Sequence, residues 1–202
     1  MKRILRQWGL FGLFVGSMLP SPAIAQTAHT TTPAEHVSRA GLPAKTADIS
    51  TFDIAADGAL RIHYSEGTRV VIPKEKGRFA VGDDILTQET FSDIHVADDR
   101  QHIGWLADYM ICAQSYPCPM ELVIFRSGRQ STYISPPFGI MWCWMFLEAG
   151  KQVVVQFGFP HGDATGAYAL YNTETGRELG TFSPTENKEA PEWVQQLRRS
   201  NR

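Results

Sequence analysis

Two stretches of this chain, about fifty residues apart, repeat the same strand–turn–strand pattern, and this repetition limits the folds open to it. Residues 94–105 can be laid over residues 144–155, because an apolar run, a polar turn and a second apolar run follow in the same order. Residues 122–129 likewise match residues 170–177, and both segments end in a Gly-Arg pair typical of a turn. The chain therefore contains two copies of one antiparallel strand pattern.

A fourth short β-rich run closes each copy, at residues 130–134 and 178–182, and a partial third copy precedes them at residues 52–72. Four-strand units that repeat roughly every 40 to 50 residues are typical of propeller blades, and closed propellers have about four to eight of them. We therefore predict an all-β fold of two to three four-stranded antiparallel blade-like units, packed as an incomplete propeller or a sandwich-like pair. Two alternatives remain open: the copies close with another chain, or they reflect the ordinary spacing of an antiparallel meander.

The first 25 residues have the composition of a secretory signal peptide. A basic segment with Lys2, Arg3 and Arg6 precedes a charge-free apolar run at residues 8–19, and small residues lead up to Ala25. This run is shorter than the roughly 20 apolar residues that cross a bilayer. We therefore predict cleavage after Ala25 and a periplasmic or secreted protein with no remaining membrane span.

The remainder of the chain divides into three parts by composition. Residues 26–48 are rich in Thr, Ala, Pro and His and have no apolar period, which predicts a flexible leader. Residues 49–185 carry short β-rich runs separated by turn residues and form the predicted blade-like domain. Residues 186–202 form a C-terminal helical tail.

Within these parts the apolar pattern predicts particular elements. The apolar run at residues 138–147 lies between turn signals and indicates a buried strand. The charged segment at residues 73–78 indicates a solvated loop. In the tail, Trp193, Val194 and Leu197 share one helical face, so we expect a short helix that caps an exposed sheet edge or end.

Charge and composition exclude several classes of partner. Without the leader the chain has 16 basic and 21 acidic side chains, a net charge of about −5. Nucleic-acid binding begins with phosphate neutralisation, so we expect no nucleic-acid partner. The chain lacks nucleophile-elbow, zincin, P-loop and dinucleotide motifs, and we predict no cofactor, no metal and no catalytic residue. His95 and His102 flank the turn at Asp98 and Asp99, where we expect solvated strand-edge side chains.

The chain has three cysteines, two of which bracket a short loop. In an exported protein a pair such as Cys112 and Cys118 is expected to form a disulfide. Their spacing is not the C-x-x-C of redox-active pairs. Cys143 lies in an apolar stretch, which favours a small core residue. A bridge from Cys143 to Cys112 or Cys118 is the second interpretation.

The candidate binding residues lie in the two connections between the second and third strands of the copies. Tyr109 and Tyr116 belong to the first connection, and His161 and Asp163 belong to the second. If the copies are true repeats, both connections emerge from the same edge of adjacent sheets. Loops on a rigid scaffold often carry function. We therefore predict that these four side chains share a binding surface.

Residues 99–129 combine Ile-Gly-Trp-Leu at 103–106, Ser-Tyr-Pro at 115–117 and a later Gly-Arg pair. In these motifs, and again at residues 161–162 and 171–176, the chain resembles a group of uncharacterised exported bacterial proteins. Members of that group look like short arrays of the strand repeat found in periplasmic β-propellers of the TolB type, which implies a blade-like fold. The group has no assigned reaction, so the resemblance implies no functional residue.

From the sequence we predict a non-catalytic binding or interaction module, with an envelope protein or a small ligand as its partner, and we expect a monomer. One alternative is an envelope hydrolase with a site around the loops at 108–119 and 159–166, in which His161 acts with Asp163 and Asp108. Another alternative is a structural accessory that pairs with a second chain through a sheet edge.

Overall fold

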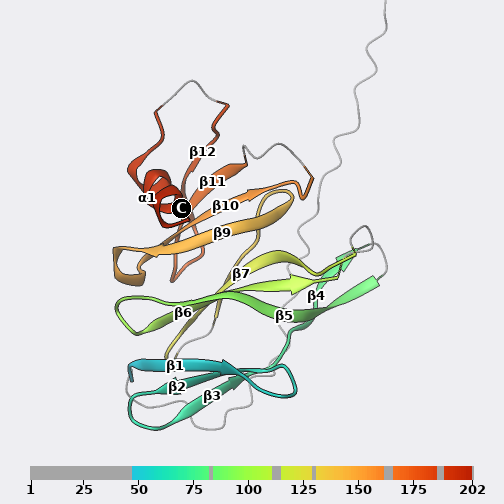
Figure 1. The fold of residues 1–202 in the computed structure, drawn as a ribbon, viewed down its shortest axis with the longest axis vertical. Coiled ribbons are helices and arrows are strands. Elements are labelled where there is room, and N and C mark those ends of the chain that lie inside the picture. The colour runs from blue at the N-terminus through green and yellow to red at the C-terminus, as the bar shows by residue number, and fades with distance from the viewer. Residues whose placement is uncertain are drawn as a thin grey trace, which may run out of the picture. The chain divides into compact units, whose positions relative to one another are not determined.

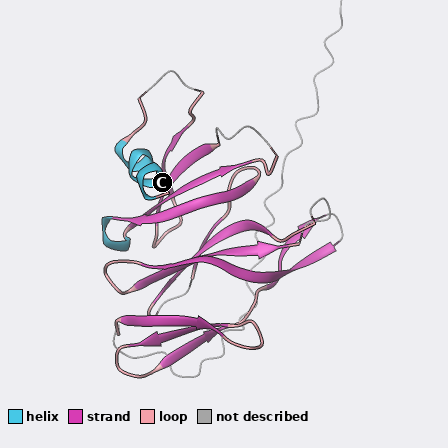
Figure 2. Cartoon of the chain, viewed as in Figure 1, coloured by secondary structure: helices cyan, strands magenta, loops and turns pink. Residues whose placement is uncertain are grey.

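The computed structural model describes residues 47–81, 84–110, 115–128, 131–161, 166–185 and 189–201. In these residues the chain forms three antiparallel sheets, a 3-10 turn and one C-terminal α-helix (Figures 1 and 2). The all-β class with a short C-terminal helix, predicted from the sequence, is confirmed. No described helix has both the length and the apolar character needed to cross a membrane.

The three sheets follow one another along the chain. The first has the order β1-β2-β3, with β1 at Ile49–Ile54, β2 at Leu60–Tyr64 and β3 at Arg69–Ile72. The second has the order β4-β5-β6-β7-β8, with strands at Lys76–Val81, Asp84–Val96, His102–Tyr109, Cys118–Arg126 and Thr132–Ile134. The third has the order β12-β11-β10-β9, where β9 is Ile140–Leu147, β10 is Gln152–Gly158, β11 is Ala167–Asn172 and β12 is Glu178–Phe182. The turn η1 spans Glu148–Gly150, and α1 spans Glu192–Ser200.

The repeated pattern in the sequence corresponds to two consecutive meanders. The first copy forms β5 to β8 and the second copy forms β9 to β12, with the strands in the same order. The partial third copy forms the three-stranded sheet β1 to β3. The predicted closing strand at residues 178–182 has the same bounds as β12. The strand predicted at residues 138–147 is β9, which begins two residues later, and Phe138 is exposed.

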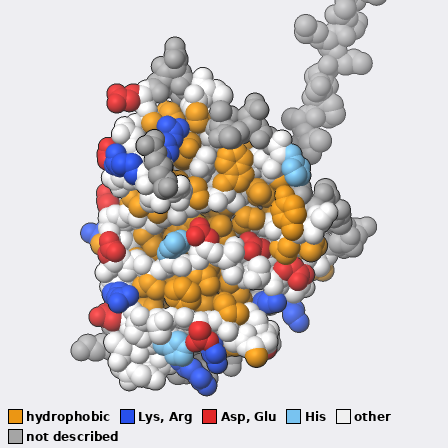
Figure 3. All heavy atoms as spheres, viewed as in Figure 1, with side chains coloured by type: hydrophobic (Ala, Val, Ile, Leu, Met, Phe, Trp, Pro, Cys, Tyr) orange, Lys and Arg blue, Asp and Glu red, His pale blue; other side chains and the backbone are white. Residues whose placement is uncertain are grey.

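The sheets pack face to face in chain order, and β6 shows why. All eight residues of β6 are buried, because the strand is covered on both faces. Ile103 and Trp105 join a core with β1 and β2 of the first sheet, whereas Leu106 joins a core with β9, β10 and β11 of the third. Alternate side chains of a strand point to opposite faces, so one strand contributes to two cores. Figure 3 shows the resulting apolar layers between the more polar margins.

The charged segment at residues 73–78 is only partly the loop that the sequence indicated. Strand β4 begins at Lys76 and pairs with β5, which itself begins at Asp84, ten residues before the repeat. The charged residue Arg78 is accommodated within β4 because its guanidinium pairs with the buried carboxylate of Glu121 on β7. The aromatic ring of Tyr133 lies 3.6 Å beneath the same guanidinium. Charge within a strand is tolerated here because it has a partner.

The two outer faces of the stack are covered in different ways. On the first sheet, Arg61 and His63 alternate with core residues of β2 and pair with Asp53, which makes that face polar. On the third sheet, α1 packs against the face, with Val194 and Leu197 fully buried against β10 and β11. Of the two predicted positions, a sheet edge or an end, the helix therefore takes the second, because it covers the last face of the stack. Without the helix, the outer face of the third sheet would be exposed. Because that face is apolar, the helix covers it.

The meanders are aligned so that corresponding turns lie at the same end. The turn between β5 and β6 touches the turn η1 between β9 and β10: a Cβ atom on Gly150 would lie 3.0 Å from Cβ of Ala97. Both turns are at the left in Figure 1. Strands β6 and β10 start there, so their last residues, Tyr109 and Gly158, lie toward the opposite end.

Candidate functional site

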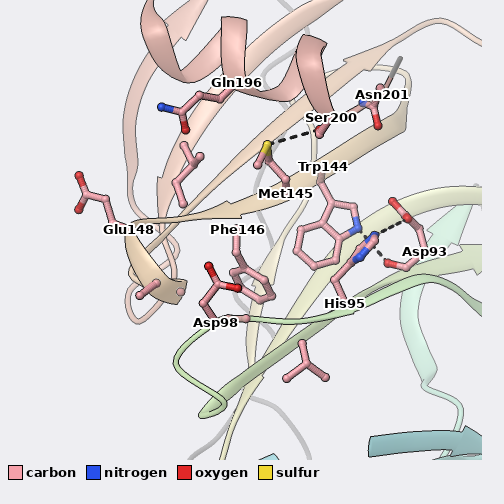
Figure 4. A pocket seen from close by; sticks show the side chains of 15 residues that line it. Asp93, His95, Asp98, Trp144, Met145, Phe146, Glu148, Gln196, Ser200 and Asn201 are labelled. Atoms are coloured by element: carbon pink, nitrogen blue, oxygen red, sulfur yellow. Dashed lines mark hydrogen bonds and ion pairs between the residues drawn. The ribbon is translucent and has the colours of Figure 1, made fainter.

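A hollow of about 510 Å³ lies where the second sheet, the third sheet and the end of α1 meet. We call it the β9 groove. It is lined by residues 93 and 95–98 of β5 and its turn, residues 144–150 of β9 and η1, and residues 196, 200 and 201 at the end of α1 (Figure 4). Its volume falls within the range of roughly 300 to 1,000 Å³ that is usual for small-molecule sites.

A β-bulge in β5 shapes one wall of the β9 groove. The register of β5 against β6 shifts between Ser92 and His95, and Asp93 within the bulge has a φ of 47°. The backbone carbonyl of Asp93 accepts a hydrogen bond of 3.1 Å from Nε1 of Trp144. Its carboxylate Oδ1 lies 2.6 Å from Nε2 of His95. The bulge thus turns an Asp–His pair toward the groove and ties it to β9.

The Asp–His pair sits beside aromatic side chains. The rings of His95 and Trp144 meet edge to face at 5.1 Å, and those of Trp144 and Phe146 do so at 5.0 Å. The hydrogen bond to Asp93 raises the pKa of His95, and partial burial opposes this effect. Trp144 is buried and belongs to the core between the sheets, whereas Phe146 is half-buried and forms part of the groove wall.

Backbone strain concentrates around the β9 groove. The described residues include four non-glycine residues with positive φ, and three of them line it: Asp93, Glu148 at 49° and Ala149 at 51°. Such conformations cost roughly 1–3 kcal/mol each and occur preferentially at functional sites. Glu148 and Ala149 lie in the turn between β9 and β10, and Arg100 lies in the turn between β5 and β6, so Asp93 is the one of the four that falls within a strand.

The charge of the lining is predominantly negative. Asp93, Asp98 and Glu148 contribute carboxylates, and the imidazole of His95 is the one basic side chain among the described lining residues. Figure 4 shows Asp98 beside Phe146 within the groove and Glu148 at its margin. This arrangement of apolar wall and exposed carboxylates is suited to a cation with an apolar body, because a ring face and a carboxylate both attract positive charge.

The described part of the groove has no arrangement for nucleophilic catalysis. Asp93 is the hydrogen-bond partner of His95, and no described Ser, Thr or Cys side chain is bonded to that ring. Ser200 at the groove donates instead to the carbonyl of Leu197 and to Sδ of Met145. No group of three or more metal-ligating acidic, His or Cys side chains occurs among the described residues.

The structure buries one of the four residues predicted to share a binding surface. Tyr109 is fully buried in the core against Phe79, so it does not contribute to a surface, and this part of the prediction is wrong. Burial raises the pKa of its phenol. Tyr116 and His161 are exposed, in connections at the end opposite η1. Asp163 lies outside the described residues.

The same end exposes two aromatic rings that the sequence interpretation did not single out. Phe138 is 44% exposed and Phe159 is 60% exposed, and their ring centroids lie 5.4 Å apart. Phe138 also contacts Phe157 of β10 edge to face. An apolar residue before β9 and another after β10 meet because Ile140 pairs with Gly158 in the ladder, which the sequence repeat alone does not reveal.

The alternative hydrolase site gains no support from Asp108. Its carboxylate is buried on β6 and accepts a hydrogen bond of 2.9 Å from the hydroxyl of Ser92. Burial raises the pKa of Asp108. His161, by contrast, is exposed in the turn after β10. A carboxylate held within the ladder by Ser92 is positioned as part of the sheet.

The cysteines are partly described. Cys118 is buried and Cys143 half-buried, and no disulfide joins these two, so the alternative bridge between them is wrong. Cys112 lies outside the described residues, and its disulfide with Cys118 stays a prediction. Burial raises the pKa of Cys143 to about 11, and its thiol donates to Oε1 of Gln156. Cys143 therefore has the environment of a core residue.

His102 differs from the solvated residue that the sequence indicated. Its side chain is buried against β9 and its Nδ1 lies 2.6 Å from Oδ2 of Asp99. The expectation was wrong because the third sheet covers this end of β6, where His102 faces Phe146.

Comparisons with known proteins give no assignment. No model of a known protein family matches the chain, and no curated protein matches it significantly.

Proposed function

We propose that the protein is a non-catalytic binding module that holds a small organic cation, an amine on an apolar body, in the β9 groove. The single observation that carries the proposal is the coincidence in one hollow of three strained residues and an excess of carboxylates. Strain of this kind persists only where the surrounding structure maintains it. Because the hollow has the size of a small-molecule site, a small ligand fits it better than a large partner does.

The ligand class follows from the lining. The half-buried ring of Phe146 and the side chain of Met145 offer apolar contact, and Asp98 offers a charge for an ammonium group. A carboxylate ligand would be repelled by the same side chains, and a neutral one would gain no charge attraction from Asp98. The signal-peptide composition of residues 1–25 supports an activity outside the cytoplasm, which is part of the same proposal.

Isothermal titration with three compounds of similar shape tests the proposal: phenethylamine, the neutral 2-phenylethanol and the anionic 3-phenylpropionate. We expect the amine to bind and the other two to bind at least about fivefold more weakly, since each exposed charge pair contributes up to about 1 kcal/mol. Equal affinity for the amine and the alcohol would contradict the proposed ligand class.

A pair of double variants locates the site. D98N/E148Q removes two carboxylates of the groove, and we expect it to weaken amine binding about fivefold. D57N/E66Q removes two turn carboxylates of the first sheet, which do not line the groove, and should leave binding unchanged. Equal effects of the two double variants would show that net charge, rather than the β9 groove, governs binding.

A further inference from the structure

A second, smaller hollow of about 250 Å³ lies between the ends of the second and third sheets. It is lined by His102 at the start of β6, Lys151 before β10, and Asn172, Thr173 and Glu174 at the end of β11. None of these residues lines the β9 groove. It therefore forms a separate site, which we call the His102 hollow.

One nitrogen of His102 is buried without a partner. The side chain is 6% exposed, and Nδ1 lies 2.6 Å from the carboxylate of Asp99. The same carboxylate accepts hydrogen bonds from the backbone N–H groups of Gln101 and His102, which fixes its position. Nε2 has no hydrogen-bond partner among the described residues. Buried polar atoms are nearly always bonded in native proteins, so this nitrogen requires an explanation.

The unpartnered edge of the ring faces the hollow. Asp99 occupies the Nδ1 edge, and a Cβ on Gly150 would lie only 2.9 Å from the same nitrogen. Neither Asp99 nor Gly150 lines the hollow, whereas His102 does. The atoms of the ring that border the hollow therefore belong to the opposite edge, which carries Nε2.

A second nitrogen beside His102 has the same property. Arg126 is the direct strand partner of His102 across β6 and β7, and its Nε is buried without a hydrogen bond to any described residue. A terminal nitrogen of the same guanidinium pairs with Glu174. Since alternate residues of β7 face the third sheet, Arg126 and His102 lie on the same face of the second sheet, and His102 is the one of the two that lines the hollow.

The remaining polar groups at the hollow are mainly donors. Lys151 is exposed and has no ion-pair partner among the described residues. Oδ1 of Asn172 already accepts from the backbone N–H groups of Glu174 and Thr175 and from the hydroxyl of Thr175. Its amide N–H₂ group is therefore the part left for a ligand. Both nearby carboxylates already have a basic partner: Asp99 pairs with His102, and Glu174 pairs with Arg126.

We propose that the His102 hollow binds a small inorganic oxyanion of the phosphate class. Lys151 supplies the uncompensated positive charge, and the side-chain amide of Asn172 supplies N–H donors. His102 takes a proton from solvent onto Nε2 and through it donates a hydrogen bond to the anion, while Asp99 continues to accept from Nδ1. The oxyanion thereby gives the buried Nε2 of His102 a partner, and charge-assisted bonds of this kind are stronger than those between neutral groups.

Nuclear magnetic resonance of the histidine ring nitrogens, combined with calorimetry, tests the proposal on the full chain. The probe is inorganic phosphate added at constant ionic strength. We expect Nε2 of His102 to move to the shift of a protonated nitrogen as the site fills. K151M should weaken phosphate binding about tenfold, and the matched variant K76M on β4 should not weaken it.

Lys151 is exposed, so K151M tests the site without the risk of unfolding that a change of buried His102 would bring. Three results overturn the proposal: no binding of phosphate, binding that leaves the Nε2 resonance of His102 unmoved, and equal loss of affinity in K151M and K76M. The last result would indicate an adventitious surface association. Amine binding in the β9 groove is measured separately, so either proposal stands or fails without the other.

Discussion

At the scale of single residues, the least solvated charge in the described chain is the carboxylate of Glu121. It is 1% exposed on β7 and accepts hydrogen bonds from Nε of Arg78 at 2.7 Å and from the hydroxyl of Ser135 at 3.2 Å. Burial raises the pKa of Glu121, and Arg78 opposes that rise. Removing one partner of a buried pair leaves an uncompensated charge, which costs far more than the pair itself contributes.

We therefore expect R78M to lower the free energy of unfolding by about 3 kcal/mol at neutral pH. The loss should shrink as the pH falls. A carboxyl whose pKa is raised by folding binds protons more readily in the folded state, so its effect on stability worsens as pH rises through that raised pKa. Urea unfolding at pH 4 and at pH 8 measures both effects.

Arg61 provides the matched control for this prediction. Its pair with Asp53 is about as exposed as surface pairs usually are, with side-chain exposures of 36% and 40%. R61M should lower the free energy of unfolding much less than R78M does and show little change between the two pH values. Equal losses in R78M and R61M would show that Glu121 is stabilised by something other than Arg78.

At the scale of elements, the contact between the second and third sheets depends on one position without a side chain. A Cβ on Gly104 of β6 would lie 2.5 Å from the ring of Trp144 and 2.8 Å from Cδ1 of Ile124. Trp144 in turn holds the bulge at Asp93 through its indole nitrogen. The small residue therefore sets how closely β9 approaches β6 and, through Trp144, the shape of the β9 groove.

We expect G104A to lower the free energy of unfolding by about 1–3 kcal/mol, as overpacking of a core does, and to weaken amine binding in the groove. Urea unfolding and the titration with phenethylamine measure the two effects. G180A on β12 is the control. A Cβ added at Gly180 would have Trp193, at 4.0 Å, as its nearest neighbour, so it would not clash. Unchanged stability in G104A would mean that the sheets do not depend on this close approach.

The sequence alone predicts elements whose pattern is local. It does not predict elements whose structure depends on a contact with a residue far away in the chain. Strand β12 and the meander order follow from apolar runs between turn residues. Strand β4 was missed because its charged residue Arg78 is accommodated by Glu121, more than forty positions away. The β9 groove was missed for a similar reason. Its strain at Asp93 and Ala149 is a backbone property, and three distant segments must meet before the hollow exists.

At the scale of the whole molecule, the stack of sheets ends in two different coverings. A polar face ends it at the first sheet, and α1 ends it at the third. Without α1, the third sheet would expose an apolar face that includes Val154, Tyr168 and Phe182. Large exposed apolar patches promote association, so we expect α1 to keep this face from associating.

We expect the full chain to be a monomer and the deletion of residues 190–202 to make it self-associate. Sedimentation velocity measures this directly. The control is E192Q/R199Q, which removes an exposed ion pair of α1 but keeps its buried residues Val194 and Leu197. A truncated chain that stays monomeric and folded would show that α1 does not cover an associating face.

The most direct test of the central claim, that the β9 groove is the binding site, is a map of amide shifts in the nitrogen-15-labelled chain as phenethylamine is added. We predict that the largest changes occur in the groove, at Asp98, Phe146 and Glu148. Largest changes at the opposite end, around Tyr116 and His161, would contradict the account, and so would the absence of any localised change.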